Sequence, residues 1–98
     1  MEIYQIIFPD DFDDYAWEVE SKGWFNGVVV IFEGKEYRIT FYDPVRLSQD
    51  VADEIFKYNF FFESNLVVIK IVNRENIEKI INKIVITKQI HDMKIEIA

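Results

Sequence analysis

The side chains with the most evident chemistry are six carboxylates gathered near the N-terminus of this 98-residue chain. They are Asp10, Asp11, Asp13, Asp14, Glu18 and Glu20. No lysine or arginine stands among them, and Phe12, Tyr15 and Trp17 are interleaved with them. Carboxylates at this density could bind a hard cation, share acid–base work or attract a basic partner.

A calcium-binding loop requires oxygen ligands at alternate positions, a glycine at position six and a glutamate at position twelve. Counted from Asp11, these two positions hold Ala16 and Lys22, and counted from Asp10 they hold Tyr15 and Ser21. The calcium pattern therefore fails in both registers. Zinc is disfavoured because the chain has one histidine and no cysteine. We expect neither a metal site nor a cofactor.

Catalytic motifs are equally sparse. The single histidine, His91, stands beside Asp92 near the C-terminus, and no serine lies in a nucleophile-elbow context. The three glycines lack the spacing of a phosphate-binding loop. Two carboxylates combined with Arg38 or Arg46 form a weaker catalytic alternative, which would need a cleft that a chain this short seldom encloses. The sequence therefore predicts a protein that is not an enzyme.

The charge is unevenly distributed along the chain. Residues 1–54 have a net charge of −9, residues 55–98 have a net charge of +2, and the whole chain carries −7. An acidic protein with a pI near 4.6 disfavours nucleic acid as a partner, although Arg74, Lys79, Lys83 and Lys88 form a local basic group. The acidic half instead favours a basic protein partner.

Tryptophan residues surrounded by acidic residues are typical of a protein–protein interface whose partner is attracted by charge. Aromatic anchors carry much of the binding energy, and surrounding charge accelerates association. The predicted partner-binding residues are Asp10, Asp11, Asp13, Asp14, Trp17, Glu18, Glu20 and Trp24. The alternative is that the aromatics pack inwards while the acids face water. Alternation of Tyr15, Trp17 and Val19 with their neighbours would achieve this in a strand.

Length and composition indicate one globular domain over residues 1–98. The absence of cysteine favours a reducing compartment. The N-terminus does not have the form of a signal peptide, and the longest apolar run, 28–32, is too short to cross a bilayer. We expect a cytoplasmic protein with no membrane contact.

The elements that must position these side chains follow from periodicity. The apolar stretch 27–32 and the alternating stretch 36–42 flank a turn at Gly34, which predicts a β-hairpin. Two further apolar stretches, 60–62 and 66–72, are strand-like. The segment 83–98 has two interpretations, either a helix continuing towards Ile90 or a last edge strand over 94–97.

Two helices are predicted. Asp43 can cap a helix over 45–58, with Ser48 as an alternative cap, and Pro44 suits its first turn. Asn73 can cap a second helix, whose apolar stripe consists of Ile77, Ile80, Ile81 and Ile84. The resulting fold class is α+β, an antiparallel β-sheet with two α-helices packed on one face.

The stretches 41–50, 65–68 and 74–77 resemble a pattern found in short bacterial proteins. As a small acidic α+β chain, the sequence also resembles the immunity proteins of bacterial toxin systems, including contact-dependent growth inhibition. This resemblance implies a cytoplasmic protein that neutralises a cognate toxin domain, often a basic nuclease, and it assigns no individual residue. The expected function is therefore an immunity-type inhibitor. The alternative is a small homo-oligomeric regulatory or housekeeping domain, and a homodimer is compatible with either.

Overall fold

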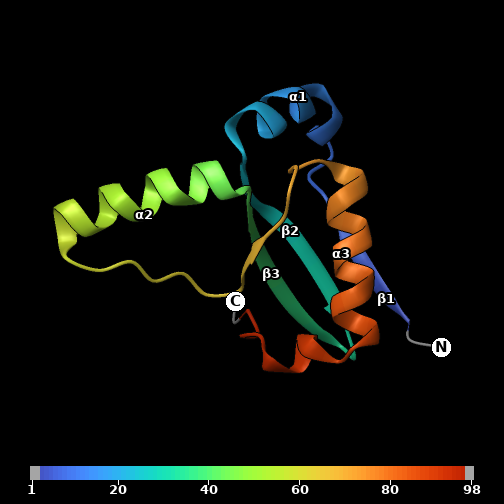
Figure 1. The fold of residues 1–98 in the computed structure, drawn as a ribbon. Helices are drawn as coiled ribbons and strands as arrows, with labels where there is room; N and C mark the ends of the chain where they lie inside the picture. The colour runs from blue at the N-terminus through green and yellow to red at the C-terminus, as the bar shows by residue number, and fades with distance from the viewer. Residues whose placement is uncertain (1–2, 97–98) are drawn as a thin grey trace.

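The computed structural model describes residues 3–96 (Figure 1). The elements in chain order are β1 (Tyr4–Ile7), α1 (Phe12–Lys22), β2 (Trp24–Phe32), β3 (Lys35–Tyr42), α2 (Pro44–Tyr58), β4 (Leu66–Val68), α3 (Arg74–Ile86) and the short 3-10 helix η1 (Gln89–Asp92). The strands form one sheet in the order β1-β2-β3-β4. Pairing is antiparallel except between β3 and β4, which are parallel. The expected α+β class is confirmed.

The predicted hairpin is the centre of the sheet. Strands β2 and β3 pair from Phe32 opposite Lys35 to Trp24 opposite Tyr42. Glu33 and Gly34 form the turn with φ values of 52° and 74°. Both residues thus adopt the left-handed backbone that two-residue hairpin turns require. Burial alternates as expected from Glu36 to Ile39, but Thr40 and Tyr42 are buried as well as Phe41, so the alternation is lost towards the end of β3.

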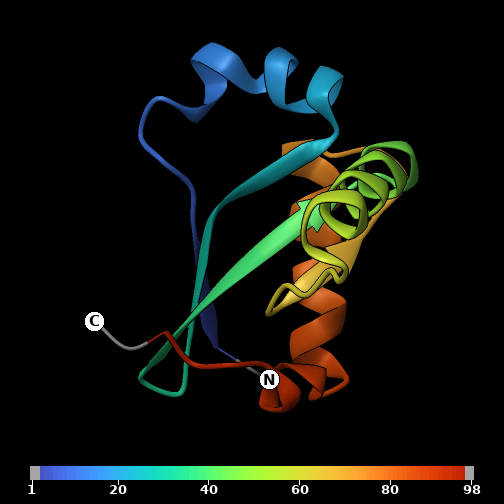
Figure 2. The same ribbon diagram turned by 90° about the vertical axis from the view of Figure 1, so that its left-hand side faces the viewer.

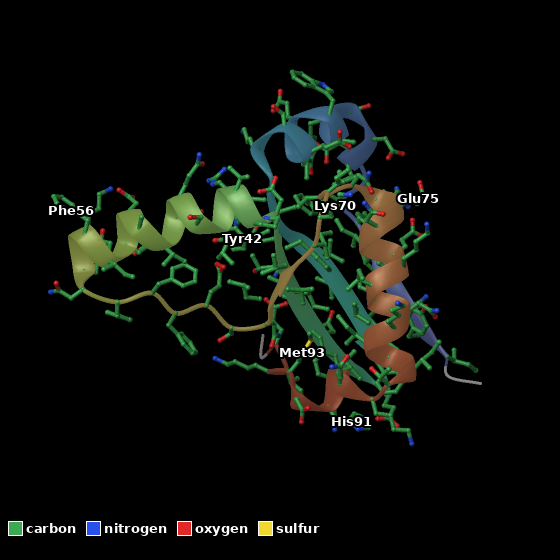
Figure 3. All side chains as sticks on the ribbon, in the orientation of Figure 1. Tyr42, Phe56, Lys70, Glu75, His91 and Met93 are labelled. Carbon is green, nitrogen blue, oxygen red and sulfur yellow. The ribbon has the colours of Figure 1, made fainter. Side chains whose placement is uncertain are left out.

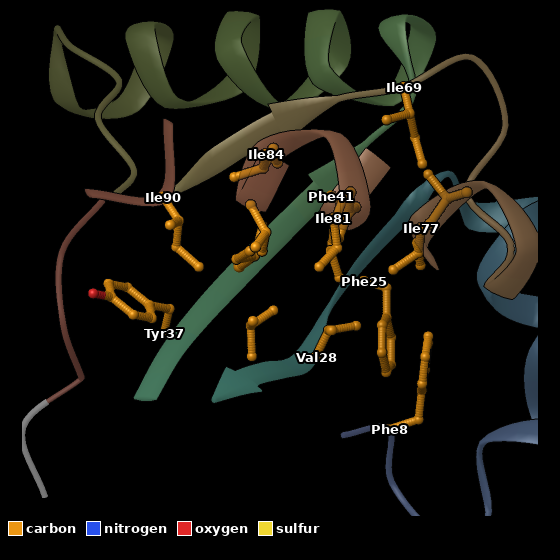
Figure 4. Packing of buried hydrophobic residues seen from close by; sticks show 14 of the residues in the cluster. Phe8, Phe25, Val28, Tyr37, Phe41, Ile69, Ile77, Ile81, Ile84 and Ile90 are labelled. Atoms are coloured by element: carbon orange, nitrogen blue, oxygen red, sulfur yellow. The ribbon is translucent and has the colours of Figure 1, made fainter. Parts of the chain in front are cut away.

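The hydrophobic core lies between this sheet and α3 (Figure 4). Ile77, Ile81 and Ile84 project from α3 towards Val28 and Phe41 of the hairpin. Asn73 caps α3 as predicted, because its side-chain oxygen accepts a hydrogen bond of 2.9 Å from the Asn76 amide. Helix α3 ends at Ile86 and η1 follows, so the expected continuation of the helix towards Ile90 is wrong.

The acidic stretch near the N-terminus is a helix, which corrects the strand-like alternation considered for it. Helix α1 lies over one end of the sheet (Figure 2). It ends at Gly23, whose φ of 71° closes the helix and whose amide bonds the Val19 carbonyl. A Cβ at this position would collide with the Asp43 carboxylate, so glycine is required for both reasons.

Helix α2 begins as predicted. Asp43 caps it through a 2.7 Å bond from the Arg46 amide, and Pro44 occupies its first turn, so Ser48 is not the cap. Its packing differs from the expectation of two helices on one sheet face. Only α3 lies on the sheet, whereas α2 has no buried residue and projects beyond the β4 edge (Figures 1 and 2).

The remaining strand expectations are only partly met. Residues 60–62 form no strand, and the strand expected over 66–72 is limited to Leu66–Val68. Residues 94–96 run beside the sheet, where the Glu96 amide bonds the Glu36 carbonyl, but they form no regular strand. The last residue of the expected 94–97 strand lies outside the described residues. Within residues 3–96, no helix is long and apolar enough to cross a membrane.

Candidate functional site

Helix α1 is held on the body of the protein by a few apolar side chains. Phe12 is completely buried and Val19 is 5% exposed. The Phe12 ring lies 4.9 Å from the rings of both Phe8 and Phe25, measured between centroids. Such aromatic pairs add to the stability gained from burial. Tyr15 and Ala16 are half-buried against the same core, and the helix is kinked at Tyr15, whose φ of −128° and ψ of 18° are not helical. These contacts attach one side of α1 to the core and leave its charged side chains on the other side.

The predicted acidic residues lie together on and just before α1. All but the half-buried Glu18 are exposed. We refer to the acidic surface as Asp10, Asp11, Asp13, Asp14, Trp17, Glu18 and Glu20. The structure thus gathers seven of the eight predicted partner-binding residues on one element and the turn that precedes it.

Some of the acidic surface is already paired within the chain. Arg74 of α3 lies 3.5 Å from the Asp13 carboxylate, and Lys22 lies 4.0 Å from Glu18. These pairs are largely exposed, so each contributes little to stability. Asp13 and Asp14 also occupy the first turn of α1, where negative charge interacts favourably with the helix dipole. Ion pairs and the helix dipole therefore account for some of the carboxylates in the acidic surface.

The exposure of Trp17 is not explained by the fold. This indole is 70% exposed on α1, although Phe12 and Val19 of the same helix are buried. Tyr15 is half-buried and packs against the core, and its pKa is raised by burial and by the charge of Asp11. The expectation that all three aromatics turn inwards is therefore wrong for Trp17. A large apolar ring is presented to solvent among carboxylates.

Trp24, the eighth predicted residue, belongs to a different environment. It begins β2, is half-buried, and lies 5.8 Å beneath the Arg46 guanidinium in a cation–π contact. It also lines a shallow hollow of about 170 Å³ with Glu18 and Lys22 of α1. Trp24 therefore adjoins the acidic surface but is held by α2 and the sheet.

The catalytic alternative receives no support from the two arginines. Arg46 bonds Asp50 at 2.9 Å and the Lys22 carbonyl, while Arg38 bonds Glu96 at 3.0 Å. The hollow beside Arg38, of about 340 Å³, has Glu96 as its single lining carboxylate. Within residues 3–96, neither arginine faces two converging carboxylates across a hollow.

A second hollow, of about 300 Å³, lies under α2 and has three lining carboxylates, Asp50, Glu54 and Glu63, but no arginine. Among the residues that the structure describes, no group of three or more such side chains is placed to hold a metal ion. His91 is exposed, with a ring nitrogen 3.2 Å from the Glu33 carboxylate.

Sequence reasoning missed a second surface. We call residues 44–65, which comprise α2 and the segment returning to β4, the α2 arm. Its exposed apolar side chains are Val45, Ile55, Phe56, Tyr58, Phe60 and Phe62. Leu47, Val51, Ala52, Ile55 and Phe56 follow at helical spacing, which predicts an amphipathic helix with its apolar side packed on the sheet. In the structure Leu47 and Val51 are only half-buried, and Ala52, Ile55 and Phe56 are exposed.

No protein-family model, curated protein sequence or solved structure matches this chain at the required significance.

Proposed function

We propose that this protein is an immunity-type inhibitor that captures a basic protein, a cognate toxin domain, through the acidic surface on α1. The exposed Trp17 carries the proposal. Burying an aromatic side chain removes about 150–250 Å² from water, and tryptophan is enriched among the residues that dominate binding energies. A ring left 70% exposed on a helix that Phe12 and Val19 anchor to the core is available for that burial in a complex.

The charge around Trp17 determines the kind of partner. Asp10, Asp11 and Asp14 are exposed, and they add to a chain whose net charge is −7. Such a field attracts a basic protein and raises the association rate, whereas it repels nucleic acid. A toxin nuclease with a basic active-site cleft fits these requirements, since carboxylates on a helix can occupy the positions of substrate phosphates.

Inhibition by this mechanism requires only a complementary surface. The side chains of the acidic surface would pair with lysines and arginines of the toxin, and Trp17 would pack against an apolar patch among them. Trp24 lies at the border of this surface and would contribute contacts at its rim. Together with the length and composition of the chain, the mechanism points to a cytoplasmic inhibitor that needs no cofactor.

The test is capture from a lysate of the source strain on immobilised protein, first at low and then at high salt. The matched baits are wild type and a variant with lysine at Asp10, Asp11, Asp13 and Asp14. A control bait makes the same change in net charge at four exposed sites at the opposite end of the molecule from α1, namely Glu33, Glu36, Asp92 and Glu96.

We expect a single basic protein to be retained by wild type and by the control, and to be lost from the α1 variant. High salt should weaken its retention, because the interaction is electrostatic. The captured protein should have an activity that is abolished by one equivalent of wild-type protein. Equal retention by all three baits would show that the acidic surface is not the binding site.

A further inference from the structure

The apolar side chains of the α2 arm are not packed against the rest of the protein. A helix that connects two parallel strands normally packs back onto their sheet. Helix α2 connects β3 to β4, yet it has no buried residue and makes no extensive contact with another helix or strand. At 15 residues it is near the length at which an isolated helix is marginal in water. Its persistence favours a second surface that packs against it.

The uncovered face is strongly apolar. Phe56 is 88% exposed, Phe62 is 78% exposed and Val45 is 67% exposed. Figure 3 shows Phe56 at the far end of α2, with its side chain directed away from the body of the protein. Scattered exposed apolar residues are ordinary, but a group of this size on one projecting element is typical of an interaction surface.

The charge on the arm is small and is largely neutralised within the helix. Arg46 pairs with Asp50 at 2.9 Å, and Lys57 pairs with Asp53 at 3.2 Å. With Glu54 and Glu63 included, the arm has a net charge of −2. A strongly basic partner would be drawn to the acidic surface on α1 instead. The arm is suited to a partner that is apolar and moderately basic where it touches.

This chain carries such a surface itself. A cleft between β4 and α3, with a volume of about 450 Å³, has apolar walls and three lysines along it. We call it the lysine cleft; it is lined by Val68, Ile69, Lys70, Asn76, Lys79, Ile80 and Lys83. No acidic residue lines it, and the 44% exposure of Val68 leaves part of its apolar wall open to solvent. Lys79 pairs with Glu75 of its own helix at 3.1 Å, so the positive charge of the cleft comes mainly from Lys70 and Lys83. The apolar walls and these two lysines complement the apolar, slightly acidic arm.

The arm cannot fill the lysine cleft of its own chain in this structure. Helix α2 leaves the end of β3 on the side away from α3, as Figure 1 shows. Phe56 lies at the distal tip of the arm, whereas Lys70 lies beside the start of α3 (Figure 3). The two complementary surfaces are therefore separated within one molecule but available to a neighbour.

We propose that a second copy of this chain covers the arm, with the α2 arm of each copy seated in the lysine cleft of the other. The two contacts are equivalent, so the assembly closes as a two-fold dimer. Each α2 is about 22 Å long, and the reciprocal contact doubles the area buried by one arm. Because the acidic surface lies outside this interface, the proposal is independent of the inhibitor function.

The first test is the self-association of purified protein, measured by sedimentation equilibrium over a concentration series. Phe56→Asp removes the most exposed apolar side chain of the arm and adds a charge. It should raise the dimer dissociation constant by about thirtyfold or more, the effect of losing a central interface residue. The variant should remain folded by circular dichroism, because Phe56 contributes nothing to the core.

The matched control is Ile3→Asp, an equally exposed apolar residue beside β1 at the opposite edge of the sheet. It should leave the dissociation constant within about twofold of wild type, as expected for a residue outside the interface. Lys70→Glu combined with Lys83→Glu should weaken the dimer, since these substitutions reverse charge in the lysine cleft. A wild-type chain that is monomeric throughout the series would overturn the proposal.

Cysteine cross-linking then identifies which surfaces meet, and the chain has no native cysteine to interfere. One preparation carries Ile55→Cys or Phe56→Cys on the arm, and the other carries Val68→Cys in the cleft. A disulfide forms only when the two Cα atoms come within about 7 Å. We expect mixed disulfides between arm and cleft variants, and none with Ile3→Cys. Cross-links formed mainly between two arm variants would overturn the seating in the cleft.

Discussion

Helix α1 and helix α2 both expose aromatic side chains, but they are attached to the protein in different ways. Helix α1 buries Phe12 and Val19 in the core and exposes the single indole of Trp17 among carboxylates. Helix α2 has no fully buried residue, and it exposes Val45, Ile55 and Phe56 beside internally paired charges. A fixed acidic platform suits a basic partner, whereas a nearly neutral apolar arm suits a second copy. The two proposed binding surfaces therefore differ both in how they are anchored and in their charge.

The largest expected effect is on the free energy of unfolding, and it should differ between a buried ring of α1 and an exposed ring of α2. Phe12→Ala should lower the free energy of unfolding by about 3–5 kcal/mol, because it leaves a cavity where a fully buried ring stood. Phe56→Ala should change it by less than about 0.5 kcal/mol, because that ring is 88% exposed. Urea denaturation at a protein concentration that keeps the chain monomeric measures both. Similar losses from the two substitutions would show that α2 is packed in solution.

The next effect concerns Tyr42, which lies at the root of the α2 arm. Burial, together with the nearby Glu63 and Asp50 carboxylates, raises the pKa of its phenol from the usual value of 10 to about 12. The folded state therefore disfavours the phenolate. The stability held below pH 10 should be lost progressively as the pH rises from 10 to 12, by about 2–3 kcal/mol.

Tyr42→Phe should remove this loss of stability at alkaline pH, whereas the control Tyr58→Phe, at an exposed position, should still show it. Urea denaturation of the three proteins between pH 9 and pH 12 provides the measurement. If Tyr42→Phe loses stability as steeply as wild type across that range, the phenol is not the group that titrates.

The smallest effect compares the caps of α2 and α3. Removing a helix N-cap costs about 1 kcal/mol. Because α3 is part of the core, Asn73→Ala should lower global stability by about that amount. Because α2 is unpacked, Asp43→Ala should instead accelerate amide hydrogen exchange within residues 44–58 and leave α3 protected. Accelerated exchange throughout the chain in Asp43→Ala would mean that the two helices unfold together.

The sequence was a good guide wherever local chemistry decides the structure. The turn at Glu33 and Gly34 and the caps at Asp43 and Asn73 were predicted from short-range patterns and are confirmed. The alternation along β3 is confirmed only from Glu36 to Ile39. These features depend on backbone conformation and on hydrogen bonds between residues a few positions apart. Both can be predicted without knowing what packs against the helix or strand concerned.

Helix α1 could have been predicted from signals that the dense charge obscured. Phe12, Ala16 and Val19 follow helical spacing, and Gly23 provides a C-terminal cap. The uncovered face of α2 had no such signal, because an amphipathic stripe has the same pattern whether it faces a core or a partner. Residues 60–62 also have a strand-like apolar pattern in the sequence. They form no strand in the structure, because no neighbouring strand is placed to pair with them.

The central claim is that the acidic surface on α1 steers a basic partner to Trp17. Its most direct test is the association rate of the captured protein with wild type, the four-lysine α1 variant and the charge-matched control, measured from low to high salt. The account predicts that lysine at Asp10, Asp11, Asp13 and Asp14 slows association about tenfold or more at low salt. It also predicts that the control slows association much less than the α1 variant, because charge close to the binding site contributes most to steering. Equal rates for the α1 variant and wild type, with no dependence on salt, would contradict it.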